Sequence, residues 1–343
     1  MTGARPGHPH GARLPWWVAS VFGETPRGSP KRLALSGQLG KWNFSALKQH
    51  GQRSEDLHMT SLATTVSVAA AQPGCSTVVR NNVTTAGLAE GPVMVLAHGF
   101  GCDQDMWARM VPFFAATHRL VLFDHVGAGA SDPAAYDAAK YASLEGYASD
   151  LVEVCREMGL TDITLVAHSV ASMMAVVAAA SEPDLFTDLV LLAPSPCYID
   201  DPETGYVGGF SRADIDELLN SLDSNYYAWA AAMAPQVMGT PDQPELGTEL
   251  TGKFCATDPT IARDFARVTF LSDTREVLPR VSTRTLVLQC SEDLLAPPAV
   301  GAYVRDALQH AVLTQLTATG HCPHVSAPAE TAAAIHAHLG TGH

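Results

Sequence analysis

Short runs of consecutive apolar residues recur along the chain from residue 75 onward. These runs cover 93–97, 120–124, 163–167, 189–193, 285–289 and 312–316. Their apolar residues occupy successive positions, which is typical of parallel strands that are covered on both faces. Residues at helical spacing between these runs predict helices over 103–114, 144–158, 169–181, 298–309 and 328–339. The alternation predicts an α/β fold with a mostly parallel sheet and helices on both faces.

The alternation of strands and helices stops between residues 197 and 275. This stretch contains no strand-like run, and its periodicity predicts helices over 211–222, 225–238 and 258–272. An insertion made only of helices is expected to form a cap over the carboxyl edge of a parallel sheet, where such sheets bind ligands. We therefore predict a core of residues 75–196 and 276–343 that is interrupted by a helical cap of residues 197–275.

The beginning of the chain differs from the rest in charge and in pattern. Residues 1–58 carry eight basic and three acidic side chains, a net charge of +5, whereas residues 59–343 carry thirteen and thirty-two, a net charge of −19. No period is sustained in this part, which is rich in Gly, Pro, Arg, His and Ser. The composition predicts a flexible basic extension over residues 1–74. Met59 is an alternative natural start, and an arm that binds a partner is the competing interpretation.

Composition excludes several classes of protein. Hydrophobic residues make up 47% of the chain, enough for a large buried core, and the net charge of −14 argues against a nucleic-acid binder. Seven cysteines without a CxxC pair favour reduced thiols and a cytoplasmic location. The uncharged run 163–180 is long enough for a membrane helix, but it contains His168 and Ser169. We expect a buried strand and helix there, and no membrane contact.

Ser169 is the candidate nucleophile. It follows a strand-like run, precedes a helix, and is flanked by the small residues Ala167 and Ala171. A nucleophile elbow requires small flanking residues because its sharp turn packs the strand against the helix. Glycine is usual at both flanking positions, so a serine that only caps the helix is the alternative interpretation.

Two further residues complete a Ser-His-Asp arrangement with Ser169. Asp293 follows the next-to-last predicted strand, and His321 follows the last one, directly after Gly320. A serine hydroxyl needs a base, and the base needs an orienting acid. The order Ser, Asp, His along the chain is that of the α/β-hydrolase fold. Glu292 is the rival acid, and His324 is the rival base.

Neither a metal nor an organic cofactor is expected. His321, Cys322 and His324 lie in one short turn, and such close ligands rarely complete a tetrahedral site without others at helical spacing. The glycines of residues 127–132 suggest a dinucleotide loop, but Pro133 follows where that motif requires a helix.

The oxyanion hole and the substrate pocket can be assigned to residues near this predicted triad. The His98-Gly-Phe-Gly-Cys segment follows the strand at 93–97, so the backbone amides of Phe100 and Val170 are the candidate oxyanion donors. An apolar stripe in the cap either packs the cap or lines a pocket. The candidate pocket residues are Phe100, His168, Tyr226, Trp229 and Met233. No motif fixes a Lys or Arg nearby, so a small, apolar, uncharged substrate is expected.

Several segments resemble the RsbQ-like α/β-hydrolases, the group of the sigma-B regulator RsbQ that also contains the plant karrikin and strigolactone receptors. These segments are 98–107, 122–132, 194–202, 254–266, 286–297 and 320–328. The resemblance extends from about Val78 to Leu339 and implies the triad of Ser169, Asp293 and His321. It also implies a four-helix cap, a small hydrophobic pocket, and a stress-signalling role with a PAS-domain phosphatase (RsbP-like) as partner.

Three hypotheses follow for the function. In the first, the chain is an esterase-type enzyme that cleaves a small ester or lactone at Ser169. In the second, the same site binds or slowly cleaves a signal molecule, and the cap then engages a protein partner. In the third, the two alanines beside Ser169 have spoiled the elbow, and the chain is an inactive interaction protein.

Overall fold

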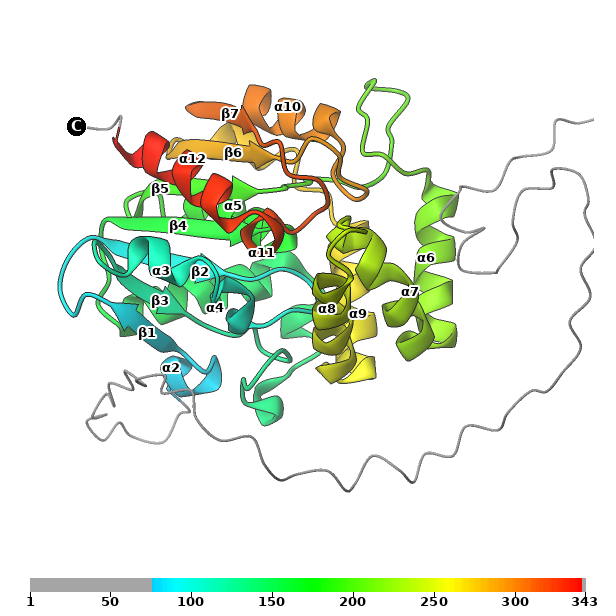
Figure 1. The fold of residues 1–343 in the computed structure, drawn as a ribbon, viewed down its shortest axis with the longest axis horizontal. Coiled ribbons are helices and arrows are strands. Elements are labelled where there is room, and N and C mark those ends of the chain that lie inside the picture. Colours follow the sequence, from blue (N-terminus) through cyan, green and yellow to red (C-terminus); the bar gives the residue numbers. More distant parts are fainter. Residues whose placement is uncertain (1–75, 341–343) are drawn as a thin grey trace, which may run out of the picture.

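The computed structural model describes residues 76–340, which form a seven-stranded sheet with helices on both faces (Figure 1). The predicted basic extension, residues 1–74, lies outside the described residues. The strands are β1 Thr84–Gly87, β2 Val93–Ala97, β3 Arg119–Leu122, β4 Ile163–His168, β5 Phe186–Leu192, β6 Arg284–Gln289 and β7 Ala311–Gln315.

The strands are arranged in the order β1-β3-β2-β4-β5-β6-β7, and all neighbours are parallel except β1 and β3. The six parallel strands are those predicted from the apolar runs. The antiparallel edge strand β1 was not predicted, because its residues Thr-Thr-Ala-Gly are mostly exposed and form no apolar run. The predicted strand at 120–124 ends at Leu122, and Asp124 instead accepts hydrogen bonds in the following loop from the amides of Gln104 and Ala130.

Two layers of helices enclose the sheet. On one face, α4 (Leu144–Glu157), α5 (Val170–Ser181) and α10 (Pro298–Ala307) pack against β-strand residues such as Val95 and Leu165. On the other, α3 (Val111–Phe114) and α12 (Pro328–Gly340) pack against residues such as Met94. The short helices are α2 (Thr77–Arg80), α11 (Pro323–Ser326), η2 (Gln104–Trp107), η3 (Pro133–Ala135), η4 (Lys140–Ala142) and η5 (Leu278–Arg280).

The predicted helix at 103–114 is wrong as a single element. The structure has the 3₁₀ helix η2 and then α3, because Pro112 within α3 has no amide hydrogen to continue the hydrogen bonding of a preceding helical turn. The predicted strand and helix within residues 163–180 are confirmed as β4 and α5. Within residues 76–340, none of the helices combines the length and the apolar character that a membrane span requires.

Four α-helices come between β5 and β6 in the sequence, and they stand over one edge of the sheet (Figure 1). They are α6 (Arg212–Ser224), α7 (Tyr226–Met238), α8 (Pro244–Ala256) and α9 (Pro259–Leu271). Their periodicity predicted α6, α7 and α9, whereas α8 was expected only from the family resemblance. Gly247, Gly252 and Thr251 interrupt the apolar stripe of α8, so the pattern of this helix is weak.

Candidate active site

The four candidate site residues lie beyond the carboxyl ends of four strands, at one edge of the sheet. Phe100 follows β2, Ser169 follows β4, Asp293 follows β6 and His321 follows β7. Because these strands are parallel, their carboxyl ends meet at the same edge. The fold therefore gathers residues that are far apart in the sequence.

Ser169 has a strained backbone at the junction of β4 and α5. Its φ of 57° and ψ of −125° are rare for a residue with a side chain, and its side chain makes no capping hydrogen bond to the helix. Ala167 and Ala171 on either side are completely buried. The sharp turn of a nucleophile elbow therefore forms with alanine at both flanks.

His321 connects Ser169 to Asp293. The imidazole Nε2 lies 2.7 Å from Ser169 Oγ, and Nδ1 lies 2.8 Å from Asp293 Oδ2. Asp293 Oδ1 accepts hydrogen bonds from the amides of Leu295 and Ala296, at 2.8 and 3.1 Å, which fix the carboxylate. With Asp293 accepting the Nδ1 proton, Nε2 is free to take the proton of the serine hydroxyl.

The rival acid and base do not take part in this arrangement. Glu292 is exposed, and its backbone carbonyl accepts a hydrogen bond from the amide of Gly320. His324 is completely buried, its two ring nitrogens have no hydrogen-bond partner among the described residues, and its ring packs between Trp107 and His168. Burial lowers the pKa of His324 to about 3, and the nearby His321 contributes to this shift.

The loop after β2 reaches the elbow through a glycine. A Cβ on Gly99 would lie 2.7 Å from His168 Nδ1 and 3.2 Å from Ser169 Cβ, so only glycine allows this approach. The amides of Phe100 and Val170 donate no hydrogen bond within residues 76–340. Both are therefore free to bind a ligand oxygen.

Backbone and imidazole contacts hold the loop that carries His321. His168 Nε2 lies 2.9 Å from the carbonyl oxygen of His321, and burial lowers the pKa of His168 well below its usual value, with His324 adding to the effect. The amide of His321 donates a hydrogen bond of 2.8 Å to the carbonyl of Val237 in α7. A cap helix therefore contacts the candidate base directly.

A cavity of about 30 Å³ lies between Ser169 and the cap. Of the predicted pocket residues, Phe100, His168, Trp229 and Met233 line it. Tyr226 does not: its ring stacks on Trp229, and its hydroxyl donates a hydrogen bond to the carbonyl of Phe254. Lining residues that the sequence analysis missed are Cys102, Tyr198, Val237, Leu250, Phe254, Thr269, Phe270, Leu295 and Cys322.

Tyr198 is the missed residue with the clearest polar role. It is almost fully buried, and burial raises the pKa of its hydroxyl, while a hydrogen bond with the Ser169 side chain opposes that rise. Its only sequence signal was its place in the segment 194–202, which carried part of the family resemblance. The remaining lining is mostly aliphatic, aromatic or thiol, and it includes no Lys or Arg among the described residues.

Comparison with known proteins agrees with this fold. The model of the Alpha/beta hydrolase family matches residues 94–334. This chain belongs to the alpha/beta hydrolase family. The predicted fold and the predicted class, an esterase-type hydrolase, are therefore confirmed at the level of the family.

Similar alpha/beta hydrolases come from plants and bacteria. The chain is 38% identical to "Probable esterase D14L" of Oryza sativa subsp. japonica, over 72% of this chain and 91% of that protein. It is 37% identical to "Karrikin insensitive 2 receptor CA" of Petunia hybrida, over the same shares of 72% and 91%. A solved hydrolase from Oleispira antarctica is 40% identical with a TM-score of 0.75, covering 78% of this chain and 97% of that chain. The predicted resemblance to the karrikin and strigolactone receptor group is confirmed.

Proposed function

We propose that this alpha/beta hydrolase cleaves a small apolar ester or lactone with Ser169 as nucleophile, His321 as base and Asp293 as orienting acid. The observation that carries the proposal is the relay of 2.7 and 2.8 Å from Ser169 Oγ through His321 to Asp293. The strained elbow at Ser169 also supports it, because the inactive alternative required a spoiled elbow.

In the proposed mechanism, His321 Nε2 takes the proton of Ser169 as Oγ attacks the substrate carbonyl carbon. The carbonyl oxygen becomes an oxyanion, which accepts hydrogen bonds from the amides of Phe100 and Val170. His321 then gives its proton to the departing alkoxide, which leaves an acyl group on Ser169. In a lactone, this alkoxide stays attached to the acyl chain.

A water molecule completes the proposed cycle. His321 accepts a proton from the water as its oxygen attacks the acyl carbon, and Ser169 Oγ leaves and regains that proton. Asp293 keeps its charge throughout and stabilises the protonated imidazole. The apolar lining of the cavity supports an uncharged substrate, because a charged group would lose its hydration without gaining a partner.

The first prediction tests the nucleophile. A fluorophosphonate probe is expected to label the wild type at Ser169, and Ser169→Ala is expected to abolish labelling and to lower the kcat for p-nitrophenyl acetate by about 10³-fold or more. Ser181→Ala is the matched control, since this serine lies at the far end of α5 and donates only to the carbonyl of Ala178. Labelling that persists in Ser169→Ala would overturn the assignment.

A receptor function is the second candidate, and the names of similar proteins favour it. Relatives are named karrikin receptors, and "Strigolactone esterase D14" of Arabidopsis thaliana is 34% identical over 70% of this chain. In this proposal, the site binds or slowly cleaves a small apolar signal molecule in the cytoplasm. The cap then engages a partner, with a PAS-domain phosphatase in a stress response as the candidate.

Turnover distinguishes the two candidates. A multiple-turnover kcat in the ordinary enzyme range of about 1–10³ s⁻¹ for a short ester supports the enzyme. A burst of one product per chain, followed by rates far below that range, supports the receptor. In that case, a purified PAS-domain phosphatase is expected to bind only while the acyl product is retained.

A further inference from the structure

Helix α8 covers the cavity with one side and contacts the core with another. Leu250 and Phe254, four residues apart, line the cavity above Ser169. Glu249 and Lys253 immediately precede them, also four residues apart, and each forms an ion pair with a core residue. Residues at this spacing share a helix face, so each pair forms one side of α8. A displacement of the helix therefore moves the two ion pairs and the two lining residues together.

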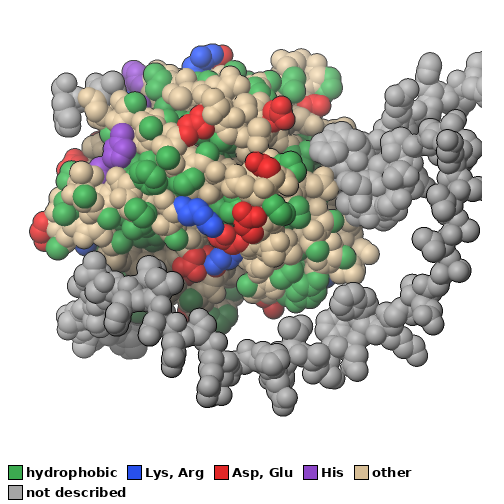
Figure 2. Space-filling model, in the orientation of Figure 1, with side chains coloured by type: hydrophobic (Ala, Val, Ile, Leu, Met, Phe, Trp, Pro, Cys, Tyr) green, Lys and Arg blue, Asp and Glu red, His purple; other side chains and the backbone are tan. Residues whose placement is uncertain are grey.

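The ion pairs join α8 to the segment that follows the candidate oxyanion loop. Arg109 donates two hydrogen bonds to Glu249, at 2.9 and 2.7 Å. Lys253 Nζ lies 2.7 Å from Asp103 and 3.0 Å from Asp105, and Asp103 is the N-cap of η2. Figure 2 shows basic and acidic side chains next to each other beside α8. We name these contacts the α8 latch.

Within residues 76–340, the latch supplies the ion pairs and side-chain hydrogen bonds between α8 and the core. Its members are partly exposed, from 16% for Asp103 to 37% for Arg109, apart from Asp105 at 77%. Partly exposed pairs of this kind are weak and sensitive to salt. Such contacts break and reform easily.

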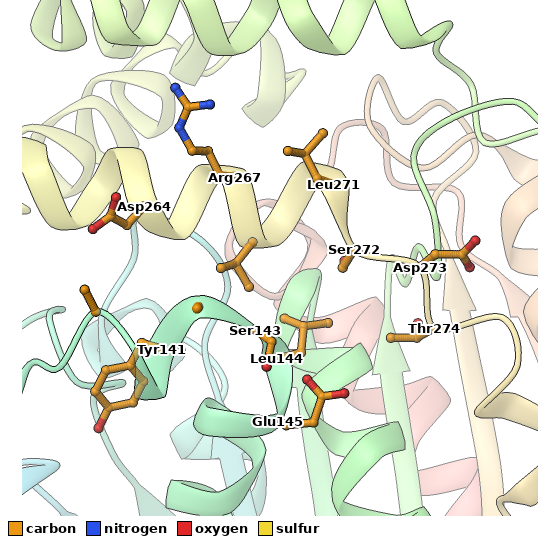
Figure 3. Close-up of a pocket in the computed structure, with 13 residues that line it drawn as sticks. Tyr141, Ser143, Leu144, Glu145, Asp264, Arg267, Leu271, Ser272, Asp273 and Thr274 are labelled. Atoms are coloured by element: carbon orange, nitrogen blue, oxygen red, sulfur yellow. The ribbon is translucent and has the colours of Figure 1, made fainter.

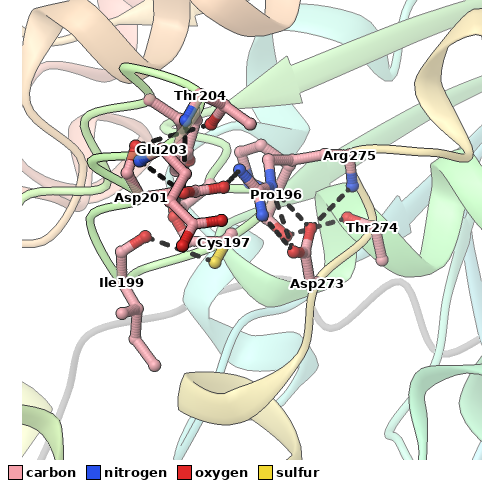
Figure 4. Close-up of polar contacts among 11 residues, drawn as sticks. Pro196, Cys197, Ile199, Asp201, Glu203, Thr204, Asp273, Thr274 and Arg275 are labelled. Atoms are coloured by element: carbon pink, nitrogen blue, oxygen red, sulfur yellow. Dashed lines mark hydrogen bonds and ion pairs between the residues drawn. The ribbon is translucent and has the colours of Figure 1, made fainter. Parts of the chain in front are cut away.

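Two further features mark the boundary between cap and core. Where the chain enters and leaves the cap, the two segments are tied together by Arg275, which pairs with Asp201 and Asp273 (Figure 4). Where α9 faces η4 and α4, Phe265 packs on Tyr147, and an open groove of about 560 Å³ lies beside this contact (Figure 3). The cap is therefore anchored at its connections to the core and through α9, and an open groove lies beside α9.

The cavity must widen before an ester enters, because about 30 Å³ holds only about two or three water molecules. We propose that the α8 latch sets how far the cavity opens, so that Arg109, Glu249 and Lys253 determine the largest acyl group that the site accepts. This inference rests on the proposed ester hydrolysis. The physical step is a displacement of α8 that carries Leu250 and Phe254 away from Ser169 once the ion pairs break.

The double variant Glu249→Gln/Lys253→Gln tests the latch without touching the cavity lining. Its ratio of kcat/KM for p-nitrophenyl octanoate to that for p-nitrophenyl acetate is expected to rise about three- to tenfold over the wild type. Sodium chloride at about 0.5 M is expected to raise the ratio in the wild type, because salt screens the ion pairs. The ratio of the variant should not change, because the variant lacks these charges. Arg212→Gln is the matched control, because it breaks an exposed ion pair with Asp216 inside α6.

Two cavity thiols provide a measurement that does not depend on catalysis. Cys102 and Cys322 lie in the lining, whereas Cys155 lies on the buried face of α4, in the core between this helix and the sheet. Peptide-resolved alkylation with N-ethylmaleimide at alkaline pH is expected to label Cys102 and Cys322 about three- to tenfold faster in the double variant. Labelling of Cys155 should not change, because it requires opening of the core.

The ester ratio and the thiol labelling distinguish failure of the latch from failure of the proposed ester hydrolysis. Faster labelling of the cavity thiols with no hydrolysis of any ester supports the latch and overturns ester hydrolysis. Hydrolysis with an unchanged ester ratio and unchanged labelling overturns the latch alone. Restoration of the wild-type ratio by the exchanged pair Arg109→Glu/Glu249→Arg, where each single change alters it, supports the direct ion pair.

Discussion

Gly99 and Ser169 show how a single atom limits the geometry of the candidate site. The loop carrying the Phe100 amide comes so close to the elbow that a Cβ on Gly99 would overlap His168. Ser169 has a conformation that is unfavourable for its own Cβ, and the small side chains of Ala167 and Ala171 still fit beside it. The elbow therefore depends on small flanking residues rather than on glycine at both positions.

Gly99→Ala is predicted to damage catalysis more than folding. The added methyl group would push the loop away from His168 and remove the Phe100 amide from the oxyanion, which lowers kcat by about 10²–10³-fold. Steady-state kinetics with p-nitrophenyl acetate measure this change. Gly340→Ala is the control, since its added Cβ would meet nothing within 4 Å. A kcat within threefold of the wild type would contradict the prediction.

The site was predictable from sequence to the extent that its residues follow strands. Ser169, Asp293 and His321 each come directly after an apolar run or a short loop, so strand order alone brings them to one edge. Cys102 follows the same strand as Phe100, and Tyr198 lies further beyond β5. Both were missed because the loop residues that face the cavity depend on how the cap packs on the core. Tyr226 was assigned to the pocket for the same reason. Its place in an apolar stripe predicts burial, but the sequence pattern is the same for a residue buried behind Trp229 and for one buried in a pocket wall.

At the scale of elements, the cap depends on two short connecting segments. Thr274 donates hydrogen bonds from its amide and its hydroxyl to the carbonyl of Pro196, and Arg275 pairs with Asp201 and Asp273. The guanidinium of Arg275 also lies 4.8 Å from the centre of the Tyr206 ring. These contacts tie the segment that enters the cap to the segment that leaves it.

Arg275→Gln is predicted to loosen these connections. The variant loses both ion pairs and the ring contact, so we expect its Tm to fall by about 2–4 °C. Thermal unfolding followed by circular dichroism measures the change. Arg305→Gln serves as the control, because Arg305 pairs only with its exposed neighbour Asp306. Equal Tm values for the two variants would contradict the prediction.

Elements with a strong repeating pattern were predicted well, and weakly patterned ones were not. Strands β2 to β7 have apolar runs, and α4 has a clear stripe, so their ends differ from the predicted ends by at most three residues. The edge strand β1 is exposed, and α8 carries glycine and threonine within its stripe. Both form through contacts with distant segments, which local periodicity does not record.

At the scale of the whole molecule, several histidines are buried in the neutral form. Burial lowers the pKa of His98, His125, His168 and His324, the last to about 3 from an ordinary value of 6.5. For these groups, the folded state binds fewer protons than the unfolded state below pH 6.5. The free energy of unfolding therefore decreases as the pH falls through that window.

His324→Leu is predicted to weaken this acid sensitivity. One buried neutral histidine contributes a slope of up to about 1.4 kcal/mol per pH unit between its unfolded and folded pKa values, here from 6.5 down to about 3. Leucine removes that slope and sacrifices no hydrogen bond, because neither ring nitrogen of His324 has a partner among the described residues. Urea unfolding at several pH values measures it, with the exposed His310→Leu as the control. Identical slopes for wild type and variant would refute the assignment.

The hydrogen bond from the His321 amide to the Val237 carbonyl links the candidate site to the outer surface of the cap. At one end of this link is the candidate base, and at the other is α7, whose Tyr227 has 55% of its surface exposed to solvent. In the proposed cycle, a displacement of the His321 backbone would be passed to the end of this helix, and a contact on the outside of α7 would be passed to His321. In the proposed function, cleavage of a small molecule and binding of a partner would therefore act on the same hydrogen bond.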